Sequence, residues 1–214
     1  MKVCEIFYSI QGEGELAGYP TIFIRLTGCN LRCRYCDTEY AFYEGKEMGI
    51  DDIIERIKGY RSRYVCVTGG EPLLQREVLD LMETLLEDGY IVSLETNGSI
   101  SLEDVCMRLG KYGDSFIISM DIKCPSSGMS ERMRLENIDL LRENDQLKFV
   151  VLDEDDYNYA KDIISRYRPR CKIIIQPVWG TDVRKIAELM LKDGLQARLS
   201  LQIHKIIWGD RRGI

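Results

Sequence analysis

The stretch "TIFIRLTGCNLRCRYCDT", residues 21–38, decides the fold of this 214-residue chain. It opens with a β-branched, apolar run that predicts a buried strand, and it continues into a loop that holds Cys29, Cys33 and Cys36. A strand that delivers reactive side chains at its carboxyl end is typical of parallel α/β proteins, which bind ligands at that edge of the sheet. Three cysteines are one fewer than a structural zinc site or a ferredoxin cluster uses. The chemistry of this loop depends on what supplies the fourth ligand.

The composition indicates a single acidic domain that spans residues 1–214. With 45% hydrophobic residues, the chain can bury one sizeable core. Its net charge of −6 gives it no broad positively charged surface for nucleic acid. The N-terminal sequence turns polar too early for a signal peptide, and no run of about 18 apolar residues predicts a membrane span. We therefore expect a cytoplasmic protein. In that reducing compartment, we interpret the five scattered cysteines as buried structural thiols, namely Cys4, Cys66, Cys106, Cys124 and Cys171.

Apolar runs like the one at 21–26 recur and alternate with segments of helical periodicity. The further runs are YVCVT (64–68), IVSLE (91–95), FIISM (116–120), LKFVV (147–151) and KIIIQ (172–176). The spacing of apolar residues predicts helices over 50–57, 79–86 and 183–190. This alternation predicts right-handed crossovers and a parallel sheet, and the apolar runs indicate burial on both faces. A complete (β/α)8 barrel needs about 250 residues, so we expect an incomplete TIM-type barrel, with a flavodoxin-like open sheet as the alternative.

Loops of unusual composition follow these strands, and in a parallel sheet they meet at one rim. They are GCNLRCRYCDT (28–38), GGEP (69–72), TNGS (96–99), DIKCPSS (121–127) and PVWG (177–180). The sequence therefore predicts one active site built from five loops.

The common uses of clustered cysteines do not explain this loop. A structural zinc site would recruit a second close pair, but the chain has no second C-x-x-C, and His204 is its only histidine. A thioredoxin-type pair needs two cysteines and leaves Cys29 unused. A ferredoxin supplies four cysteines in recognisable spacing. A [4Fe-4S] cluster held by three thiolates would instead leave one iron open to a small molecule.

The spacing C-x-x-x-C-x-x-C of residues 29–36 resembles that of the radical S-adenosylmethionine (SAM) superfamily. The resemblance implies that the amino and carboxylate groups of SAM bind the open iron, and that an electron from the cluster splits SAM to give a 5′-deoxyadenosyl radical. The stretch TGGEP (68–72) resembles the glycine-rich SAM loop of the superfamily. There we expect Gly69 and Gly70 to let the backbone approach SAM closely.

A longer series of motifs resembles the 7-carboxy-7-deazaguanine synthase family and spans nearly the whole chain. The stretches are FYSIQGEGELAGYPTIFIRLTGCNLRCRYCDTEYA (7–41), VTGGEPLLQ (67–75), ETNGS (95–99), DIKCPSSGM (121–129) and QPVWG (176–180). The resemblance implies a carbon–nitrogen lyase that converts 6-carboxy-5,6,7,8-tetrahydropterin to 7-carboxy-7-deazaguanine with loss of ammonia, in queuosine, archaeosine or other deazapurine biosynthesis. It also implies a [4Fe-4S] cluster, regenerated SAM and Mg2+ as cofactors. The implied partners are the pterin substrate, an external reductant such as a flavodoxin or ferredoxin, and a second copy in a homodimer.

The same resemblance implies roles for individual residues. The cluster ligands would be Cys29, Cys33 and Cys36, and Thr38 would bind Mg2+. The residues expected to contact SAM are Tyr35, Cys36, Asp37, Gly70, Ser119, Met120, Asp121, Gln176, Pro177, Val178 and Trp179. The residues expected to contact the pterin are Ile10, Gln11, Gly12, Arg25 and Thr68.

Structural interpretations of several of these residues stay open. Residues 10–12 suit a glycine-rich hairpin loop, and Thr38 suits a turn cap. Arg25 is costly to bury without an anionic partner, which is either the pterin carboxylate or an acidic side chain of the chain itself. Met120 and Trp179 suit a plain core. We assign no role to Lys123, Cys124, His204 or the C-terminal tail.

Two other functions remain as alternatives. A glycyl-radical-enzyme activase is also small and carries C-x-x-x-C-x-x-C, but it has no use for SIQGEG (9–14) or DIKCPSSGM (121–129). A non-catalytic iron–sulfur electron carrier would need no glycine-rich SAM loop and would supply a fourth ligand. SAM binding separates the carrier from the enzymes, and turnover of the carboxypterin separates the two enzymes.

Overall fold

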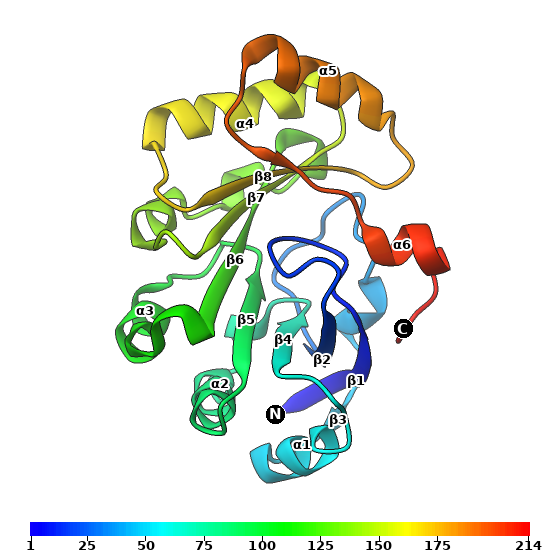
Figure 1. Cartoon of the computed structure of the whole chain (residues 1–214), viewed down its shortest axis with the longest axis vertical. Helices are drawn as coiled ribbons and strands as arrows, with labels where there is room; N and C mark the ends of the chain where they lie inside the picture. The colour runs from blue at the N-terminus through cyan, green and yellow to red at the C-terminus, as the bar shows by residue number, and fades with distance from the viewer.

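The computed structural model describes all 214 residues and places every strand in one sheet (Figure 1). The strand order is β3-β1-β2-β4-β5-β6-β7-β8-β9. The bounds are β1 Lys2–Ile10, β2 Pro20–Leu26, β3 Lys46–Glu47, β4 Tyr64–Gly69, β5 Ile91–Thr96, β6 Phe116–Lys123, β7 Gln146–Val151, β8 Lys172–Pro177 and β9 Arg198–Leu199. β1 pairs antiparallel with β2 and β3, and all pairs from β2 to β9 are parallel. Because β3 and β9 are the two edge strands and do not pair with each other, the sheet does not close, which confirms the incomplete barrel.

Helices cover the outside of this curved sheet. Their bounds are α1 Ile50–Ile57, α2 Val78–Glu87, α3 Glu103–Leu109, α4 Glu154–Tyr167, α5 Val183–Asp193 and α6 Ile203–Trp208. Figure 1 shows α1 to α5 following one another around the outer side, whereas α6 lies on the open side. Short 3-10 helices occupy residues 39–42, 72–74, 110–115, 125–127, 130–132 and 135–140. The crossovers therefore leave the inner side of the sheet free for a site.

The six strands and three helices predicted from the sequence are confirmed. The three helices are α1, α2 and α5, and α2 ends shortly before Gly89, whose φ of 85° lies in the left-handed region that glycine adopts freely. The elements that the sequence analysis did not predict are β1, β3, β9, α3, α4 and α6. β1 turns back into β2 through residues 11–19, so the suggested glycine-rich loop at residues 10–12 is part of a real hairpin.

The two faces of the sheet differ because successive side chains of a strand point to opposite sides. Beneath the helices, the outer face is fully apolar and holds Ile22, Ile24, Val65, Val67, Leu94, Ile118, Met120 and Phe149. The inner face carries Arg25, Thr68, Glu95, Asp121, Lys148 and Gln176, which line a cavity. The expected burial on both faces is confirmed for inner residues such as Ser93, Lys148 and Gln176, but the inner face is polar and not apolar. One face packs on helices, and the other is the polar wall of a pocket.

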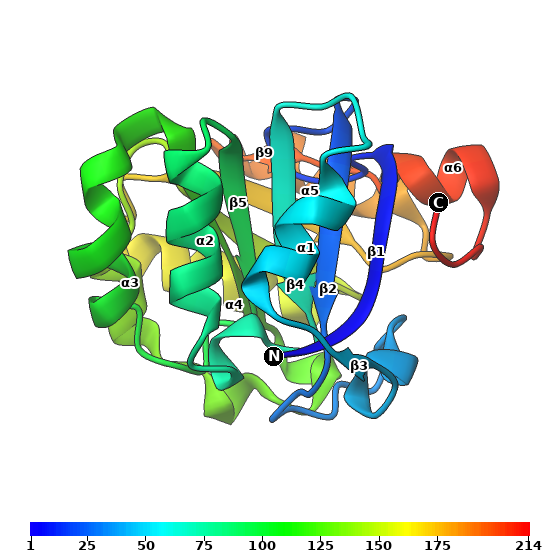
Figure 2. The ribbon, with the colours of Figure 1, turned by 90° about the horizontal axis from the view of Figure 1, so that it is seen from below.

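The last residues of the chain, 200–214, form a C-terminal segment that crosses the open side of the sheet. The Ser200 N–H donates to the Ile175 carbonyl in β8 (2.9 Å), and the Ile203 N–H donates to the Gly12 carbonyl in the β1–β2 loop (3.0 Å). Figure 2 shows α6 beside β1, at the side of the molecule away from α3. The segment thus spans from one side of the sheet to the other. None of the helices is both long and apolar enough to cross a membrane.

Candidate active site

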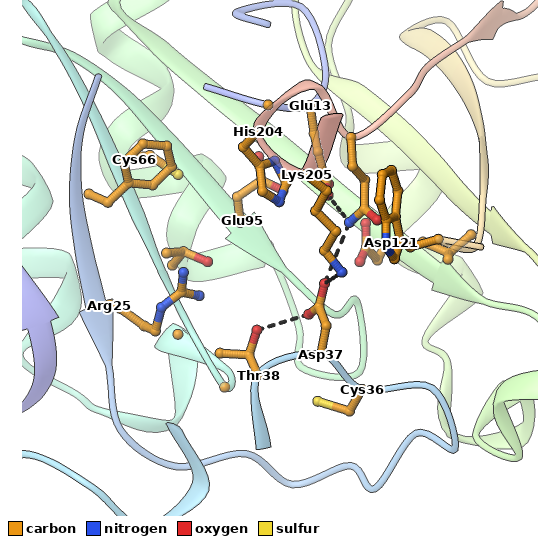
Figure 3. A pocket seen from close by; sticks show the side chains of 18 of the residues that line it. Glu13, Arg25, Cys36, Asp37, Thr38, Cys66, Glu95, Asp121, His204 and Lys205 are labelled. Atoms are coloured by element: carbon orange, nitrogen blue, oxygen red, sulfur yellow. Dashed lines mark hydrogen bonds and ion pairs between the residues drawn. The ribbon is translucent and has the colours of Figure 1, made fainter. Parts of the chain in front are cut away.

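A cavity of about 540 Å³ lies against the inner face of the sheet (Figure 3). All five loops of unusual composition contribute to its lining, through residues 29, 31, 33, 35–38, 69–70, 96–97, 121, 123 and 177–179. The C-terminal segment supplies further lining residues, namely Gln202, His204, Lys205 and residues 209–214. The carboxyl ends of the parallel strands therefore meet the end of the chain at one cavity, whose volume suits a small-molecule ligand.

The cysteine loop, residues 28–38, is fastened at both ends and in the middle. The Gly28 N–H donates to the Ala41 carbonyl (2.8 Å), which closes the base of the loop. The Tyr35 hydroxyl donates to the Val150 carbonyl at the end of β7 (3.3 Å), and the Arg34 N–H donates to the Ser127 carbonyl (3.0 Å). These contacts place the loop across the ends of several strands rather than leaving it free in solvent.

The three thiols of the cysteine loop all line the cavity. No three His, Cys, Asp or Glu side chains converge closely enough to hold a single metal ion. Three thiols at one cavity suit a multi-iron cluster in which each thiolate binds a different iron. Burial raises the pKa of the Cys33 and Cys36 thiols. Asn97 lies behind the loop, with its side-chain nitrogen 3.8 Å from the Cys29 sulfur and donating to Asn30 Oδ1 (3.1 Å).

The glycines of the GGEP motif are required by the chain itself. A Cβ on Gly69 would lie 2.4 Å from the Leu26 carbonyl oxygen, and one on Gly70 would lie 2.2 Å from the Gly28 carbonyl oxygen. We expected these glycines to make room for SAM, but the space that their Cβ atoms would fill belongs to β2 and the cysteine loop. Gly70 nevertheless lines the cavity. Its predicted contact with SAM stays a prediction.

Glu71, the acid of the same motif, is fully buried. Its carboxylate accepts hydrogen bonds from the Asn97 N–H (2.7 Å), the Thr96 hydroxyl (2.9 Å) and the Leu73 N–H (3.0 Å). Burial nevertheless raises the pKa of Glu71 to about 7. Glu71 thus ties the TNGS loop, which carries Asn97, to the GGEP loop.

A buried charge cluster in the cavity wall was missed by the sequence analysis. The Lys148 ammonium contacts Glu13 Oε2 at 2.7 Å, Asp121 Oδ1 at 3.1 Å and Glu95 Oε2 at 3.3 Å. These carboxylates hold the pKa of Lys148 well above its usual value despite its burial. Lys123 adds a second cation, 2.6 Å from Asp121 Oδ2, so it is a cavity residue and not a solvated surface charge. Three carboxylates and two ammonium groups thus leave an excess of negative charge.

Arg25 has a protein partner and also faces the cavity. Its Nε donates to Glu5 Oε1 (2.8 Å), and Glu5 also accepts from the Tyr40 hydroxyl (2.8 Å). The two terminal nitrogens of Arg25 form no hydrogen bond within the chain, and Figure 3 shows the guanidinium pointing into the cavity. The sequence analysis left open whether Arg25 pairs with an acidic side chain of the chain itself, and the ion pair with Glu5 shows that it does. The two terminal nitrogens of Arg25 remain free for a ligand.

Thr38 and Asp37 end the cysteine loop at the cavity. The Thr38 hydroxyl donates to Asp37 Oδ1 (2.9 Å) and makes no capping bond to the helical turn that follows, so the turn-cap interpretation does not describe its side chain. Lys205 of α6 lies 2.8 Å from Asp37 Oδ2. Burial alone would raise the pKa of Asp37, but Lys205 and the Thr38 hydroxyl outweigh burial and lower this pKa to about 2.

The C-terminal segment packs on the residues that we expect to touch the pterin. The ring of His204 lies directly over Gly12, where a Cβ would come within 1.8 Å of Nδ1. Gln202 donates to Glu13 Oε1 (2.8 Å), and burial lowers the pKa of His204. His204 is thus held in the cavity wall.

Most of the predicted SAM and pterin residues line the cavity. They are Ile10, Gln11, Gly12, Arg25, Tyr35, Cys36, Asp37, Thr68, Gly70, Asp121, Gln176, Pro177, Val178 and Trp179. Gln176 is buried, and its Oε1 has no hydrogen-bond partner within the chain, as expected of an acceptor that a ligand would satisfy. Ser119 and Met120 do not reach the cavity lining. Met120 lies on the outer face in the apolar core, and Ser119 is buried below the surface of the inner face.

Known proteins resemble this chain in sequence and in fold. The model of the radical SAM superfamily matches residues 23–153. The chain is 41% identical to the 7-carboxy-7-deazaguanine synthase of Thermoplasma acidophilum over 214 residues, which cover all of both chains. It is 44% identical to the 7-carboxy-7-deazaguanine synthase of Methanospirillum hungatei over 208 residues, 97% of this chain and 85% of the relative. The crystal structure of QueE from Escherichia coli superposes with a TM-score of 0.76 at 23% identity, covering 94% of this chain and 93% of that one, and it shows the same fold.

The partial barrel, the three-cysteine loop and the matching superfamily model define a radical SAM protein. The full-length similarity is more specific. The chain belongs to the 7-carboxy-7-deazaguanine synthase family.

Proposed function

We propose that this protein is a radical SAM lyase that converts 6-carboxy-5,6,7,8-tetrahydropterin to 7-carboxy-7-deazaguanine with loss of ammonia. The observation that carries the proposal is the single cavity in which the cysteine loop, the GGEP loop and buried charged side chains meet. An electron carrier has no use for such a cavity. An activase is not favoured either, because the relatives that match over the full length are synthases.

The cavity residues fit the cofactors that the family implies. Cys29, Cys33 and Cys36 would hold the [4Fe-4S] cluster, while Gln176 and Trp179 would contact SAM. When bound, the cluster and SAM supply reductive cleavage of the sulfonium and, through it, removal of a hydrogen atom from the substrate. The remaining work is binding and orientation, which falls to the side chains of this chain.

Charge distribution across the cavity suggests how the pterin is oriented. The free terminal nitrogens of Arg25 suit the substrate carboxylate, because a bidentate guanidinium–carboxylate pair fixes both distance and angle. The negative excess around Lys148 suits the N–H groups of the aminopyrimidine ring. The C-terminal segment would exclude water from the bound ring, since Gln202 and Lys205 tie it to Glu13 and Asp37.

Thr38 is the proposed Mg2+ ligand. Its hydroxyl proton is directed to Asp37 Oδ1, so the oxygen lone pairs remain available to a hard cation at the cavity. Mg2+ held by Thr38, water and substrate oxygens would fix the carboxylate and stabilise negative charge as it shifts. Thr38→Ala should keep the cluster and SAM binding yet lose most of the response of turnover to added Mg2+, whereas Thr38→Ser should retain much of it. A fully Mg2+-dependent Thr38→Ala enzyme would place the metal elsewhere.

The proposal includes a cellular setting. All eight cysteines are unpaired thiols, in keeping with a reducing cytoplasm. From the family resemblance we also propose that the protein is a homodimer and uses an external one-electron reductant. Light scattering measures the oligomeric state directly.

Two assays on anaerobically reconstituted protein test the function. Equilibrium binding of SAM separates an enzyme from an electron carrier. Formation of 7-carboxy-7-deazaguanine and ammonia from the carboxypterin, with dithionite as reductant, separates this lyase from an activase. Reconstituted protein that binds SAM but leaves the carboxypterin unchanged would refute the proposed reaction.

A further inference from the structure

Asn97 of the TNGS loop reaches the cysteine loop from a neighbouring strand end. It directly follows β5 and is 6% exposed, and its side-chain nitrogen Nδ2 lies 3.8 Å from the Cys29 sulfur. The Leu31 N–H, at 3.4 Å, is a backbone donor to the same sulfur. No other side chain donates a hydrogen bond to the thiol of Cys29, Cys33 or Cys36. Asn97 is thus the side chain that is placed to act on a cluster ligand.

The amide of Asn97 is held in one orientation. Its oxygen Oδ1 accepts hydrogen bonds from the Ser99 N–H (3.0 Å) and the Ser99 hydroxyl (2.6 Å). Its nitrogen donates to Asn30 Oδ1 (3.1 Å), and the Asn30 side-chain nitrogen donates to the Ser99 hydroxyl oxygen (2.8 Å). The three side chains therefore form a closed ring, because a flipped amide would turn its nitrogen towards the two donors of Ser99. Of the two N–H groups on Nδ2, one is used by Asn30 and the other is available to the Cys29 sulfur.

The backbone around Asn97 is also fixed. Its N–H donates to the buried Glu71 carboxylate (2.7 Å), which accepts from the Thr96 hydroxyl as well (2.9 Å). The next residue, Gly98, has a φ of 72°, and a Cβ there would lie 2.9 Å from the Asp121 carbonyl oxygen. A left-handed conformation in so little space requires glycine. The loop therefore presents the Asn97 side chain to the cysteine loop from a well-anchored base.

A purely structural role does not account for the nitrogen of this side chain. The bond from the Ser99 N–H to Oδ1 closes a turn that asparagine and aspartate both make. An aspartate, however, would set a second oxygen against Asn30 Oδ1 and the Cys29 sulfur, which are both acceptors. The amide nitrogen serves only these two acceptors. Of the two, the sulfur is the one that becomes negatively charged when a metal is bound.

We propose that Asn97 acts through Cys29, by donating to its thiolate and so raising the reduction potential of the [4Fe-4S] cluster. The inference rests on the proposed radical SAM function. A metal-bound cysteine is a thiolate, so the N–H···S bond is charge-assisted and stronger than the same bond to a thiol. One-electron reduction by the external reductant adds negative charge that the sulfurs share. A donor at sulfur therefore favours the reduced state, and hydrogen bonds of this kind help to set iron–sulfur potentials.

Redox titration of the reconstituted holoenzyme, followed by EPR, measures this potential directly. Asn97→Leu removes the donor and should lower the equilibrium constant for one-electron reduction about tenfold, which corresponds to about 59 mV. Asn97→Asp keeps the turn with Ser99 but replaces the donor by a charged acceptor. Its potential should therefore lie below that of Asn97→Leu.

The matched control is Asn30→Ala, which removes the other acceptor of the same nitrogen and leaves Ser99 to hold the amide oxygen. Asn97→Leu and Asn30→Ala both lose the bond between the two asparagines, but only Asn97→Leu loses the bond to sulfur. The potential of Asn30→Ala should match that of the parent. An equal drop in both variants would assign the effect to loop packing and overturn the proposal.

A measurement on the parent keeps the proposal testable if a variant takes up no cluster. With a nitrogen isotope label confined to asparagine side chains, pulsed EPR of the reduced cluster should show coupling to a labelled nitrogen, and Asn30→Ala should retain it. An absent coupling, or equal potentials for the parent, Asn97→Leu and Asn97→Asp, would contradict the role of Asn97. If the proposed reaction were wrong instead, the parent would leave the carboxypterin unchanged while these potentials still differed, so the two failures are distinguishable.

Discussion

Arg25 pairs with Glu5 through Nε and faces the cavity with its two terminal nitrogens. A single substitution separates the contribution of the ion pair to the fold from that of the free nitrogens to substrate binding. Glu5 keeps two other partners when Arg25 is changed, the Tyr40 hydroxyl at 2.8 Å and Arg212 at 3.2 Å. The fold should therefore tolerate Arg25→Met, although the cavity loses its free guanidinium nitrogens.

Arg25→Met should raise the KM for the carboxypterin by about tenfold or more, because a desolvated charge-assisted contact is worth several kcal/mol. SAM cleavage without substrate should continue. Arg25→Lys, which keeps a charge but lacks the bidentate geometry, should have a KM between those of the parent and Arg25→Met. Steady-state kinetics measures both variants, and an unchanged KM in a folded Arg25→Met enzyme would leave Arg25 with its structural role alone.

Glu71 predicts a pH dependence of stability. Its pKa is raised by burial from 4.5 to about 7, so the folded state holds a proton that the unfolded state releases between these values. The contribution of Glu71 to the free energy of unfolding is fully present below about pH 4.5. About 3 kcal/mol of it is lost as the pH rises through 7. Glu71→Gln removes the titration. Between pH 5 and pH 8, the free energy of unfolding of the variant, measured with urea, should increase relative to that of the parent. Parallel pH profiles of the two proteins would contradict the assignment.

The positions of Lys148 and Glu95 on the cavity side of the sheet could have been predicted from the sequence. In FIISMDIK, LKFVV and IVSLE, polar residues alternate with apolar ones, and each polar residue faces the cavity side of the sheet. Arg25 drew attention as a charge inside an apolar strand, and Lys148 meets the same criterion. Reading the runs as uniformly apolar obscured this period of two. Glu13 carried no comparable pattern, because only the fold brings its loop to Lys148.

At the scale of elements, the strands and helices with strong apolar periodicity were predictable and the polar ones were not. The buried residues of α4 are only Asp156, Tyr157, Ala160 and Ile163, and most of its other residues are charged or polar. Its start was nevertheless signalled by Asp153, whose carboxylate accepts from the Asp156 N–H (3.0 Å). α6 has a single buried residue, Lys205, because its position depends on contacts with distant loops and not on an apolar face.

The docking of α6 on the β1–β2 loop gives a prediction for Gly12. A methyl group at this position collides with His204, so Gly12→Ala should displace α6 and weaken pterin binding. Amide hydrogen exchange over residues 203–208 should speed up. In a His204→Ala background the added effect of Gly12→Ala should shrink, because the colliding ring is gone. Gly59→Ala, where no atom lies within 4 Å of the added carbon, is the control. Unchanged exchange in Gly12→Ala would refute this packing role.

At the scale of the whole molecule, the C-terminal segment crosses the open side of the partial barrel and lines its cavity. The alternation of strand and helix along the sequence indicated the sheet and the rim with the five loops. It did not indicate that residues 200–214 would cross the open side, because the contacts of Lys205 with Asp37 and of Arg212 with Glu44 join residues far apart in the chain. The cysteine spacing indicated the chemistry, and tertiary structure alone placed the orienting charges around it.

The central claim is that this cavity uses SAM as a regenerated cofactor to rearrange a carboxypterin. The most direct test is anaerobic turnover of excess carboxypterin with limiting SAM. The account predicts many molecules of 7-carboxy-7-deazaguanine per SAM consumed, with Cys106→Ala as active as the parent and Cys29→Ala inactive and lacking the iron–sulfur chromophore. Consumption of one SAM per product, or turnover by Cys29→Ala, would contradict it.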